Sequence, residues 1–223
     1  MLSAPRNPVP IFPLPNLVLF PHTRVPLQVF ELRYRTMVRD ALSGERVLAL
    51  ALLRRGWERE YEESPAFHDL GCLARFEEVG WLPNDCYQLV VSGLSRVRLG
   101  RVTREFPYRA ARVTLLQQEP YSEDDPLVLS ERQAVQESLL RFATAAGAGE
   151  NPPQRLEDAL EQVPYEHLVN QLCTVIDGGA EEKLELLSMD SVLERGRRAR
   201  ELARRRRRIV PPPAPGDQPG ERN

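Results

Sequence analysis

Seven prolines fall within the first 26 residues, and this clustering constrains the fold more than any other feature of the chain. Proline has no backbone N–H, so it is tolerated mainly at strand starts, sheet edges and turns. Apolar runs of four to six residues lie among these prolines. The pattern predicts short strands broken by turns at residues 9–14, 17–20 and 25–30, with one turn at Pro15-Asn16.

One helix is predicted next, over residues 31–42. Its apolar side chains recur at helical spacing on one face: Tyr34, Met37, Val38, Ala41 and Leu42. Ser43-Gly44 supplies the stop signal. The continuous apolar run at 47–53 is typical of a buried strand, whereas 54–69 is polar and irregular, which indicates a long loop.

Further strands are predicted at residues 71–79, 87–92, 96–102 and 109–116, with a hairpin turn at Pro83-Asn84-Asp85. Six or more short strands around one early helix favour a closed or half-closed β-barrel.

From Tyr121 onward the apolar residues change from strand to helix spacing. Short helices are predicted at 135–142, 156–163, 168–176 and 184–187, and Asp190 is the expected N-cap of a last helix. Residues 147–153 read as a linker within this half. The sequence therefore predicts a β-barrel over 1–118, a helical bundle over 119–208 and a disordered proline-rich tail over 209–223.

Charge divides the chain into three zones. Residues 1–116 carry 16 arginines against 12 acids, residues 117–194 carry 17 acids against four bases, and residues 195–223 carry ten arginines against three acids. The net charge of the whole chain is only −2, so composition does not imply a globally basic or acidic partner.

The three cysteines form no C-x-x-C pair, which argues against a disulfide framework and against a zinc site. The opening MLSAPRNPVPIFPLP is broken by prolines where a signal peptide needs an unbroken apolar run. No stretch approaches the roughly 18 apolar residues of a membrane span. We therefore expect a cytoplasmic protein with no membrane partner, metal or cofactor.

Catalytic motifs were sought and not found. A P-loop needs a Gly-x-x-x-x-Gly-Lys-Ser/Thr run, and the only lysine, Lys183, lies between acids on a predicted helix surface, where we expect it to be solvated. Cys72 and His68 are the only neighbouring cysteine and histidine, and a strand cysteine is more often a small core residue than a nucleophile. The sequence predicts that the chain is not an enzyme.

The arginine-rich stretch 195–208 contains nine arginines, five of them consecutive. Such a cluster can bind the phosphates of nucleic acid, through Arg204, Arg205, Arg206, Arg207 and Arg208. Cations at a helix C-terminus are also favourable in themselves, and these could face the acidic bundle. No aromatic residue is interleaved for base stacking, so the structural interpretation is preferred and nucleic-acid binding is the alternative.

Three sequence motifs resemble the amino-terminal domain of Lon proteases. They are the opening VPIFPLPNLVLFP followed by VPLQVFELRYR, the run GCLARFEE, and YQLVVSGLSRVRL followed by PYRA, in the family's order. The resemblance covers about residues 8–205 and implies an α+β fold, in which a PUA-like β pseudobarrel with one early helix precedes a C-terminal helical subdomain. The chain ends before the ATPase and Ser-Lys peptidase modules of full Lon proteases could begin, so a stand-alone domain is expected.

The resemblance also implies a non-catalytic module that recognises exposed or unfolded segments of other polypeptides, with a separate protease or chaperone as a further candidate partner. An extended peptide could add to a strand edge or lie beside the first helix. Large aromatics and arginine are the usual anchors of protein interfaces. The candidate peptide-binding residues are therefore Glu31, Arg33 and Tyr34 at the helix start, and Trp57 and Trp81 in loops.

Overall fold

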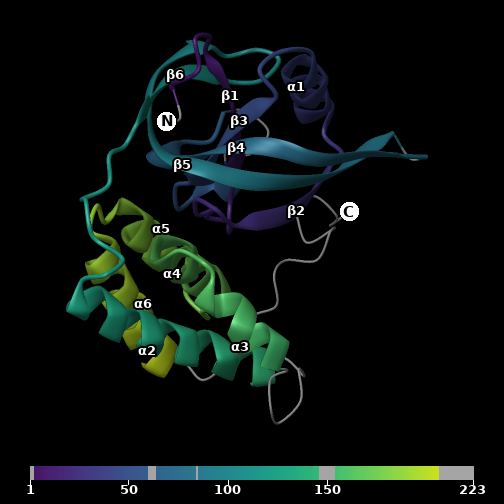
Figure 1. The fold of residues 1–223 in the computed structure, drawn as a ribbon. Coiled ribbons are helices and arrows are strands. Elements are labelled where there is room, and N and C mark those ends of the chain that lie inside the picture. The colour runs from purple at the N-terminus through teal and green to yellow at the C-terminus, as the bar shows by residue number, and fades with distance from the viewer. Residues whose placement is uncertain (1–2, 60–63, 84, 146–153, 206–223) are drawn as a thin grey trace. The chain divides into compact units, whose positions relative to one another are not determined.

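The computed structural model describes residues 3–59, 64–83, 85–145 and 154–205. The chain divides into two compact units, and the described part of the first ends at Leu116 while the second begins at Gln117 (Figure 1). The predicted boundaries at 118 and 208 stay predictions. The predicted linker 147–153 and the predicted tail 209–223 lie outside the described residues.

The first unit is a mixed six-stranded sheet that closes on itself. Its strands are β1 (Val9–Leu14), β2 (Arg24–Val29), β3 (Val47–Leu53), β4 (Phe67–Leu82), β5 (Cys86–Arg104) and β6 (Ala110–Leu115). They follow the order β2-β5-β4-β3-β1-β6, and β6 also pairs with β5. Because β5 is 19 residues long, its first half pairs with β2 and its second half with β6. Five strands therefore form a closed ring, to which β2 is attached.

The predicted strands at 9–14 and 47–53 are confirmed residue for residue. The two strands predicted at 87–92 and 96–102 are instead one strand, β5, because the chain bends at a bulge near Leu94 without leaving the sheet. Residues 67–69, predicted as loop, begin β4, and a short 3₁₀ turn η1 spans Trp57–Arg59.

The strand predicted at residues 17–20 is wrong, because this segment is irregular. Its apolar side chains are nevertheless buried, so it packs onto the sheet as a loop. His22 N–H donates to the carbonyl of Gly93 at 2.8 Å, and Gly93 N–H donates to the carbonyl of Thr23 at 2.9 Å. A Cβ at position 93 would lie 2.2 Å from the Phe20 carbonyl oxygen, so only glycine allows this approach.

Helix α1 (Leu32–Ser43) covers one face of the sheet and confirms the predicted helix. Alternate residues of β1 and β3 enter two different apolar clusters. One cluster joins α1 to the sheet through Met37 and Val38 of the helix and Phe12 and Leu89 of the strands. The other contains mainly small and β-branched residues: Val9, Ile11, Ala49, Ala51, Leu73, Val97, Leu99 and Ala111.

The second unit is helical, as predicted. Its helices are α2 (Pro126–Ala143), α3 (Gln154–Glu161), α4 (Tyr165–Val175), α5 (Ala180–Ser188) and α6 (Val192–Arg205). The predicted N-cap at Asp190 is wrong by one residue, because the Ser191 hydroxyl accepts from Glu194 N–H at 3.4 Å while the Asp190 carbonyl accepts from Glu119 N–H. None of the helices in the described ranges is long and apolar enough to cross a membrane.

Candidate functional site

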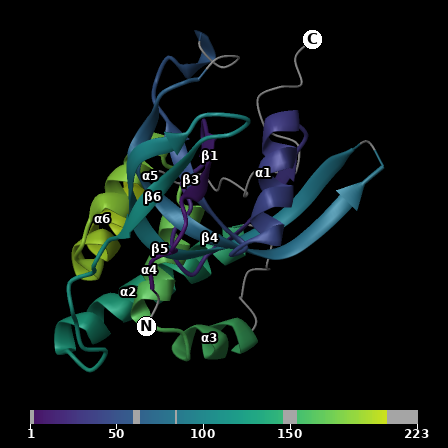
Figure 2. The same ribbon diagram turned by 90° about the horizontal axis from the view of Figure 1, so that it is seen from above.

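The outer part of the β4–β5 hairpin projects from the first unit, and we refer to residues 77–91 as the arm (Figures 1 and 2). β2 extends the arm to three strands by pairing with residues 87–92 of β5. Val29 pairs with Tyr87, and Tyr87 pairs with Trp81, so these three side chains form one row across β2, β5 and β4. Directly opposite residues share a face of the sheet. The row therefore begins in the core at Val29 and ends at the outer strand on Trp81.

Helix α1 packs on this face of the sheet. It starts two residues after β2, where Arg35 Nη1 donates to the carbonyl of Asp85 at the arm's turn at 2.7 Å and also pairs with the Asp85 carboxylate. It ends near the base of the arm, where Phe76 N–H donates to the carbonyl of Arg46 at 3.3 Å. On the outer part of β4, the side chains of Val79 and Trp81 remain exposed.

Two large apolar side chains, Val79 and Trp81, are exposed on the outer part of β4, and a third, Leu32, is exposed at the start of α1; we call these three residues the arm patch. Their exposed fractions are 36%, 56% and 67%. Val79 and Trp81 lie two residues apart on β4, so they point to the same face. Leu32 lies one helical turn before Arg35 and so on the side of α1 that reaches the arm. The Trp81 ring contacts Tyr87 edge-on at 4.7 Å between centroids, which fixes its orientation.

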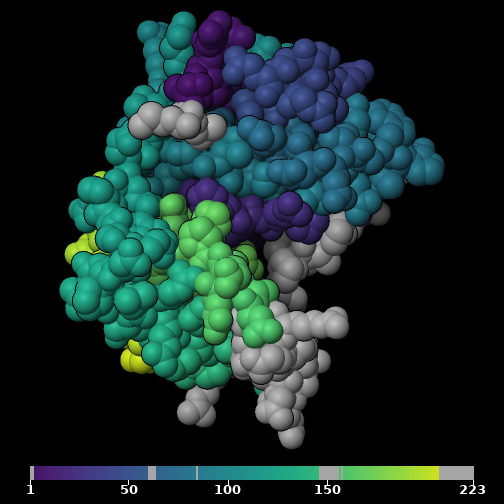
Figure 3. Space-filling model, in the orientation of Figure 1, coloured from purple at the N-terminus to yellow at the C-terminus, as the bar shows by residue number. Residues whose placement is uncertain are grey.

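The arm forms a ridge on the surface of the unit (Figure 3). Trp81 was predicted to lie in a loop, and it lies instead on β4, one residue before the end of the strand. Sequence reasoning missed Val79 and Leu32. The alternation of Val79 and Trp81 with Glu78 and Gly80 was the available signal for the first of these. No local pattern marks Leu32, whose exposure follows from where α1 packs on the sheet.

The predicted residues Glu31, Arg33 and Tyr34 are brought together at the start of α1. Arg33 Nε donates to Glu31 Oε2 at 2.8 Å, and the Arg33 guanidinium lies 4.8 Å from the centre of the Tyr34 ring. Tyr34 itself is only 5% exposed and packs against Phe12 at 4.7 Å between ring centroids. Tyr34 is therefore a core residue, and it affects the surface only through its ring contact with Arg33.

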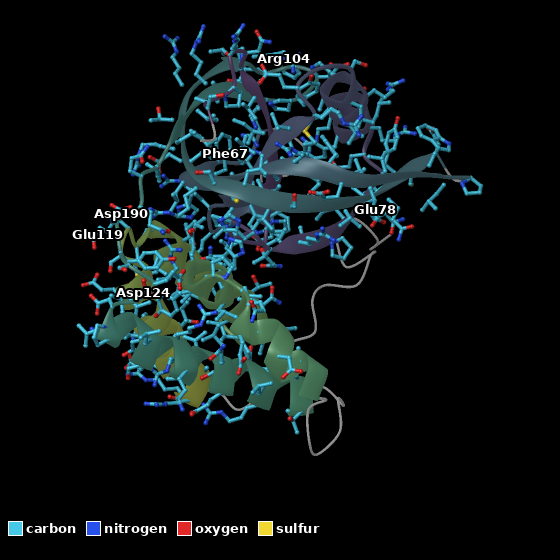
Figure 4. All side chains as sticks on the ribbon, viewed as in Figure 1. Phe67, Glu78, Arg104, Glu119, Asp124 and Asp190 are labelled. Atoms are coloured by element: carbon cyan, nitrogen blue, oxygen red, sulfur yellow. The ribbon has the colours of Figure 1, made fainter. Side chains whose placement is uncertain are left out.

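Two residues that the sequence did not indicate complete this cluster. Arg109 lies close enough to Tyr34 for its charge to lower the pKa of that phenol, donates from Nη1 to the Pro65 carbonyl at 2.7 Å and stacks over the ring of Phe67 at 4.5 Å. Phe67 lies at the start of β4 (Figure 4). Burial lowers the pKa of the Arg109 guanidinium and raises the pKa of Tyr34. The cluster is held by contacts between α1, β4 and the start of β6, which only the folded chain supplies.

Trp57, the remaining predicted aromatic, is half-buried in η1. Its binding role stays a prediction.

The arginines of α6 are engaged within the helical unit. Arg195 is fully buried, and its guanidinium donates to Asn170 Oδ1 at 2.8 Å and to the Met189 carbonyl at 2.6 Å. Arg197 and Arg200 both pair with Glu131, the former at 3.0 Å. Arg198 pairs with Glu201 at 2.9 Å and Arg205 pairs with the same carboxylate. These contacts favour the structural interpretation for these five arginines, and nucleic-acid binding stays an untested alternative.

Among the alternative nucleic-acid contacts, Arg204 is exposed and Arg205 is paired with Glu201. Arg206, Arg207 and Arg208 lie outside the described residues.

The geometry disfavours a cysteine nucleophile. Cys72 is buried, and burial raises the pKa of its thiol to about 12, so the thiolate is scarce near neutral pH. His68 lies four residues earlier on the same strand, which places it about 13 Å away at a rise of about 3.3 Å per residue. A hydrogen-bonded Cys–His pair is therefore not formed.

Lys183 differs from the solvated surface cation that was predicted. Its Nζ donates to the Thr174 carbonyl near the C-terminus of α4 at 2.7 Å, and burial lowers the pKa of its ammonium group. Lys183 satisfies a carbonyl at a helix end, a structural role.

The described residues include a hollow in each unit. A groove of about 230 Å³ in the first unit contains Tyr108, whose hydroxyl donates to Asp40 Oδ2 at 2.7 Å, beneath Arg104 (Figure 4). A shallow hollow of about 370 Å³ in the second unit is bordered by Asp124 and Leu129. Among the described side chains, no group of three or more His, Cys, Asp or Glu is placed to hold a metal ion.

Comparison with known proteins gives relatives of one kind. Lon protease 2 of Myxococcus xanthus is 28% identical over 206 residues, covering 91% of this chain and 24% of the relative. Lon protease of Anaeromyxobacter dehalogenans is 27% identical over 209 residues, again covering 91% of this chain and 24% of the relative. The chain thus spans about a quarter of the length of these curated relatives.

Solved structures share the fold. The N-terminal domain of Mycobacterium avium complex Lon protease superposes with a TM-score of 0.67 at 18% identity, over 89% of this chain and 98% of that chain. The Lon N-terminal domain protein from Xanthomonas campestris gives a TM-score of 0.59 at 23% identity, over 85% and 94% of the two chains. These structures confirm the predicted α+β class with a helical C-terminal part.

A family model described as the ATP-dependent protease La (LON) substrate-binding domain matches residues 8–205. This match spans both units and confirms the resemblance recognised in the opening motif. The chain belongs to the LON substrate-binding domain family.

Proposed function

We propose that this chain is a non-catalytic recognition module that binds exposed apolar segments of unfolded or partly folded polypeptides, and that the arm patch is its principal contact surface. The observation that carries this proposal is the exposure of Val79 and Trp81 on one face of β4, together with that of Leu32 at the start of the helix that Arg35 ties to the arm. Exposed apolar surface that collects at one place is typical of an interaction site.

Contacts that hold Trp81 and the turn of the arm support this role. The Trp81 ring is held by Tyr87, and Arg35 ties α1 to the turn of the arm. An aromatic side chain that is already oriented loses little conformational entropy on binding. Family membership supports the same proposal, since the family model is described as a substrate-binding domain.

The proposal assigns no chemical step to the chain. The buried Cys72 thiol and the carbonyl-bound Lys183 are structural groups, and neither lies in a hollow with a base beside it. A separate protease or chaperone that receives the bound polypeptide is part of the proposal. So is a cytoplasmic setting, which three buried free cysteines support.

The direct test is binding of a fluorescently labelled, permanently unfolded polypeptide, measured by anisotropy. Trp81→Ala is expected to weaken binding by about thirtyfold, because truncating a central interface aromatic typically costs about 2 kcal/mol and each 1.4 kcal/mol is tenfold. Phe106→Ala is the matched control, since Phe106 is also an exposed aromatic of the first unit, at 85%, but lies between β5 and β6.

The control variant is expected to bind as tightly as the parent. Equal losses in the two variants, or unchanged binding in Trp81→Ala, would contradict the proposal. Chemical-denaturation midpoints equal to that of the parent show that the first unit keeps its packing in both variants.

A further inference from the structure

The outer stretch of β4 has an open edge. β3 stops pairing with β4 at Arg75, whereas β4 continues to pair with β5 as far as Leu82. From Glu77 to Leu82 the strand is therefore bonded on one side only, within the described part of the chain. At about 3.3 Å per residue this open edge is about 20 Å long, which is enough for a short extended segment.

The hairpin geometry fixes which backbone groups face the open edge. The turn joins Leu82 to Cys86 through three residues, Asp85 has a positive φ of 60°, and Asp85 N–H donates to the Leu82 carbonyl at 3.1 Å. In a hairpin of this kind the Leu82 carbonyl accepts from the turn and the Leu82 N–H donates to the Cys86 carbonyl, so both backbone groups of Leu82 point toward β5. Bonding then alternates along the strand, so the N–H and C=O groups of Val79 and Trp81 point to the open edge.

The same two residues carry the exposed apolar side chains. A strand added at this edge would thus bond to the backbone of Val79 and Trp81 and place every second side chain against theirs. Gly80, between them, adds no side chain on the opposite face. The edge therefore offers backbone hydrogen bonds and apolar contacts at every second residue, which is the spacing at which an extended chain presents them.

The β2 edge of this sheet is protected against the addition of another strand, and the open edge of β4 is not. β2 forms the far edge and carries Pro26 in its middle, and proline is a usual means of blocking strand addition. The open stretch of β4 contains no proline, and its bulge lies at the base, between Phe76 and Glu78. Protection of one edge alone suits a sheet that receives a strand at the other.

We infer that the open edge of β4 binds its ligand by strand addition, and that the ligand is an extended polypeptide segment with apolar side chains at every second residue. This inference rests on the proposed function and specifies how the arm patch is used. Main-chain bonds supply affinity with little dependence on sequence, and the alternating apolar side chains supply selectivity.

The test uses a capped peptide of alternating valine and threonine, together with two versions that are N-methylated on the valines alone or on the threonines alone. N-methylation removes a donor and leaves the side chain in place, and it requires no change to the protein. Only one set of amides can face β4, so one version is expected to lose at least about tenfold in affinity while the other binds like the parent peptide. Loss on valine methylation identifies antiparallel addition, and loss on threonine methylation identifies parallel addition.

Equal loss in both versions, or loss in neither, would overturn the inference even if Trp81→Ala still abolished binding, which would leave the proposed function standing. Failure of the parent peptide to bind would count against both. Amide hydrogen exchange is the second readout. Val79 and Trp81 are expected to exchange quickly in the free protein and slowly with peptide, whereas Gly80 is protected in both states. Protection of Val79 and Trp81 in the free protein, together with a dimer in sedimentation, would show that a second copy occupies the edge and would also overturn the inference.

Discussion

Arg195 lies in the arginine-rich stretch, yet its side chain is fully buried, and its replacement separates a structural from a phosphate-binding role. Its guanidinium donates to Asn170 Oδ1 and to the Met189 carbonyl, both inside the helical unit. Arg195→Met keeps most of the aliphatic stem and removes both donors. Leaving a buried acceptor unbonded costs about 1–3 kcal/mol. Methionine is less costly to bury than a guanidinium, which offsets part of the loss, so the free energy of unfolding of this unit should fall by about 2–4 kcal/mol.

The assay is chemical denaturation followed by two signals. Both tryptophans, Trp57 and Trp81, lie in the first unit, so their fluorescence reports that unit, while ellipticity at 222 nm is dominated by the helices of the second. The ellipticity midpoint is expected to shift strongly in Arg195→Met. Arg204→Met is the matched control, because Arg204 is exposed in the last turn of the same helix and its loss should change stability by less than about 0.5 kcal/mol. An Arg195→Met protein as stable as this control would refute the reasoning.

Three further predictions concern packing and titration. Gly196→Ala should lower the free energy of unfolding of the helical unit by about 1–3 kcal/mol, because a Cβ there would lie 2.6 Å from the Tyr165 hydroxyl oxygen. An unchanged denaturation curve would contradict this prediction. The free energy of unfolding should fall between about pH 10 and pH 12, because burial raises the pKa of Tyr108 and Tyr121 to about 12 in the folded protein. As the pH rises, these phenols therefore ionise in the unfolded chain at a lower pH than in the folded one. A free energy of unfolding that stays constant across this range would contradict the prediction. Burial raises the thiol pKa of both Cys72 and Cys173 to about 12, so these residues should react with Ellman's reagent at pH 8 only as fast as the protein unfolds. Rapid labelling of either thiol in the native protein would contradict this prediction.

Much of the fold could be predicted because the spacing of apolar residues along the chain indicates most of its strands and helices. The runs at Val9–Leu14 and Val47–Leu53 are buried strands, and the apolar stripe of α1 matches its buried face. Leu17–Phe20 looked like a strand because a buried loop and a buried strand are both rich in apolar residues, and sequence alone does not distinguish them. Lys183 looked solvated because its acidic neighbours suggested pairing, whereas a carbonyl of α4, distant in sequence, holds it.

The candidate site was harder to predict. An exposed aromatic at Trp81 could be proposed from residue type alone, but Tyr34, chosen by the same argument, lies in the core. The difference arises only in the folded chain, because Tyr34 packs against Phe12 whereas Trp81 lies near the outer end of β4. Arg109 and Phe67 could not be found from the sequence, because strand pairing and the packing of α1 bring them to Tyr34 from positions 75 and 33 residues away.

The central claim is that apolar contact at the arm, and not the arginine run, binds the ligand. The most direct test titrates a labelled unfolded polypeptide and a labelled DNA duplex against the full chain, and against a chain truncated at Arg204, at low and moderate salt. Apolar burial is insensitive to salt over this range, whereas five or more phosphate contacts would give a log–log salt slope of about −4 or steeper. We predict polypeptide binding that changes little with salt and survives the truncation. Salt-sensitive binding of DNA that is lost on truncation, without polypeptide binding, would contradict the claim.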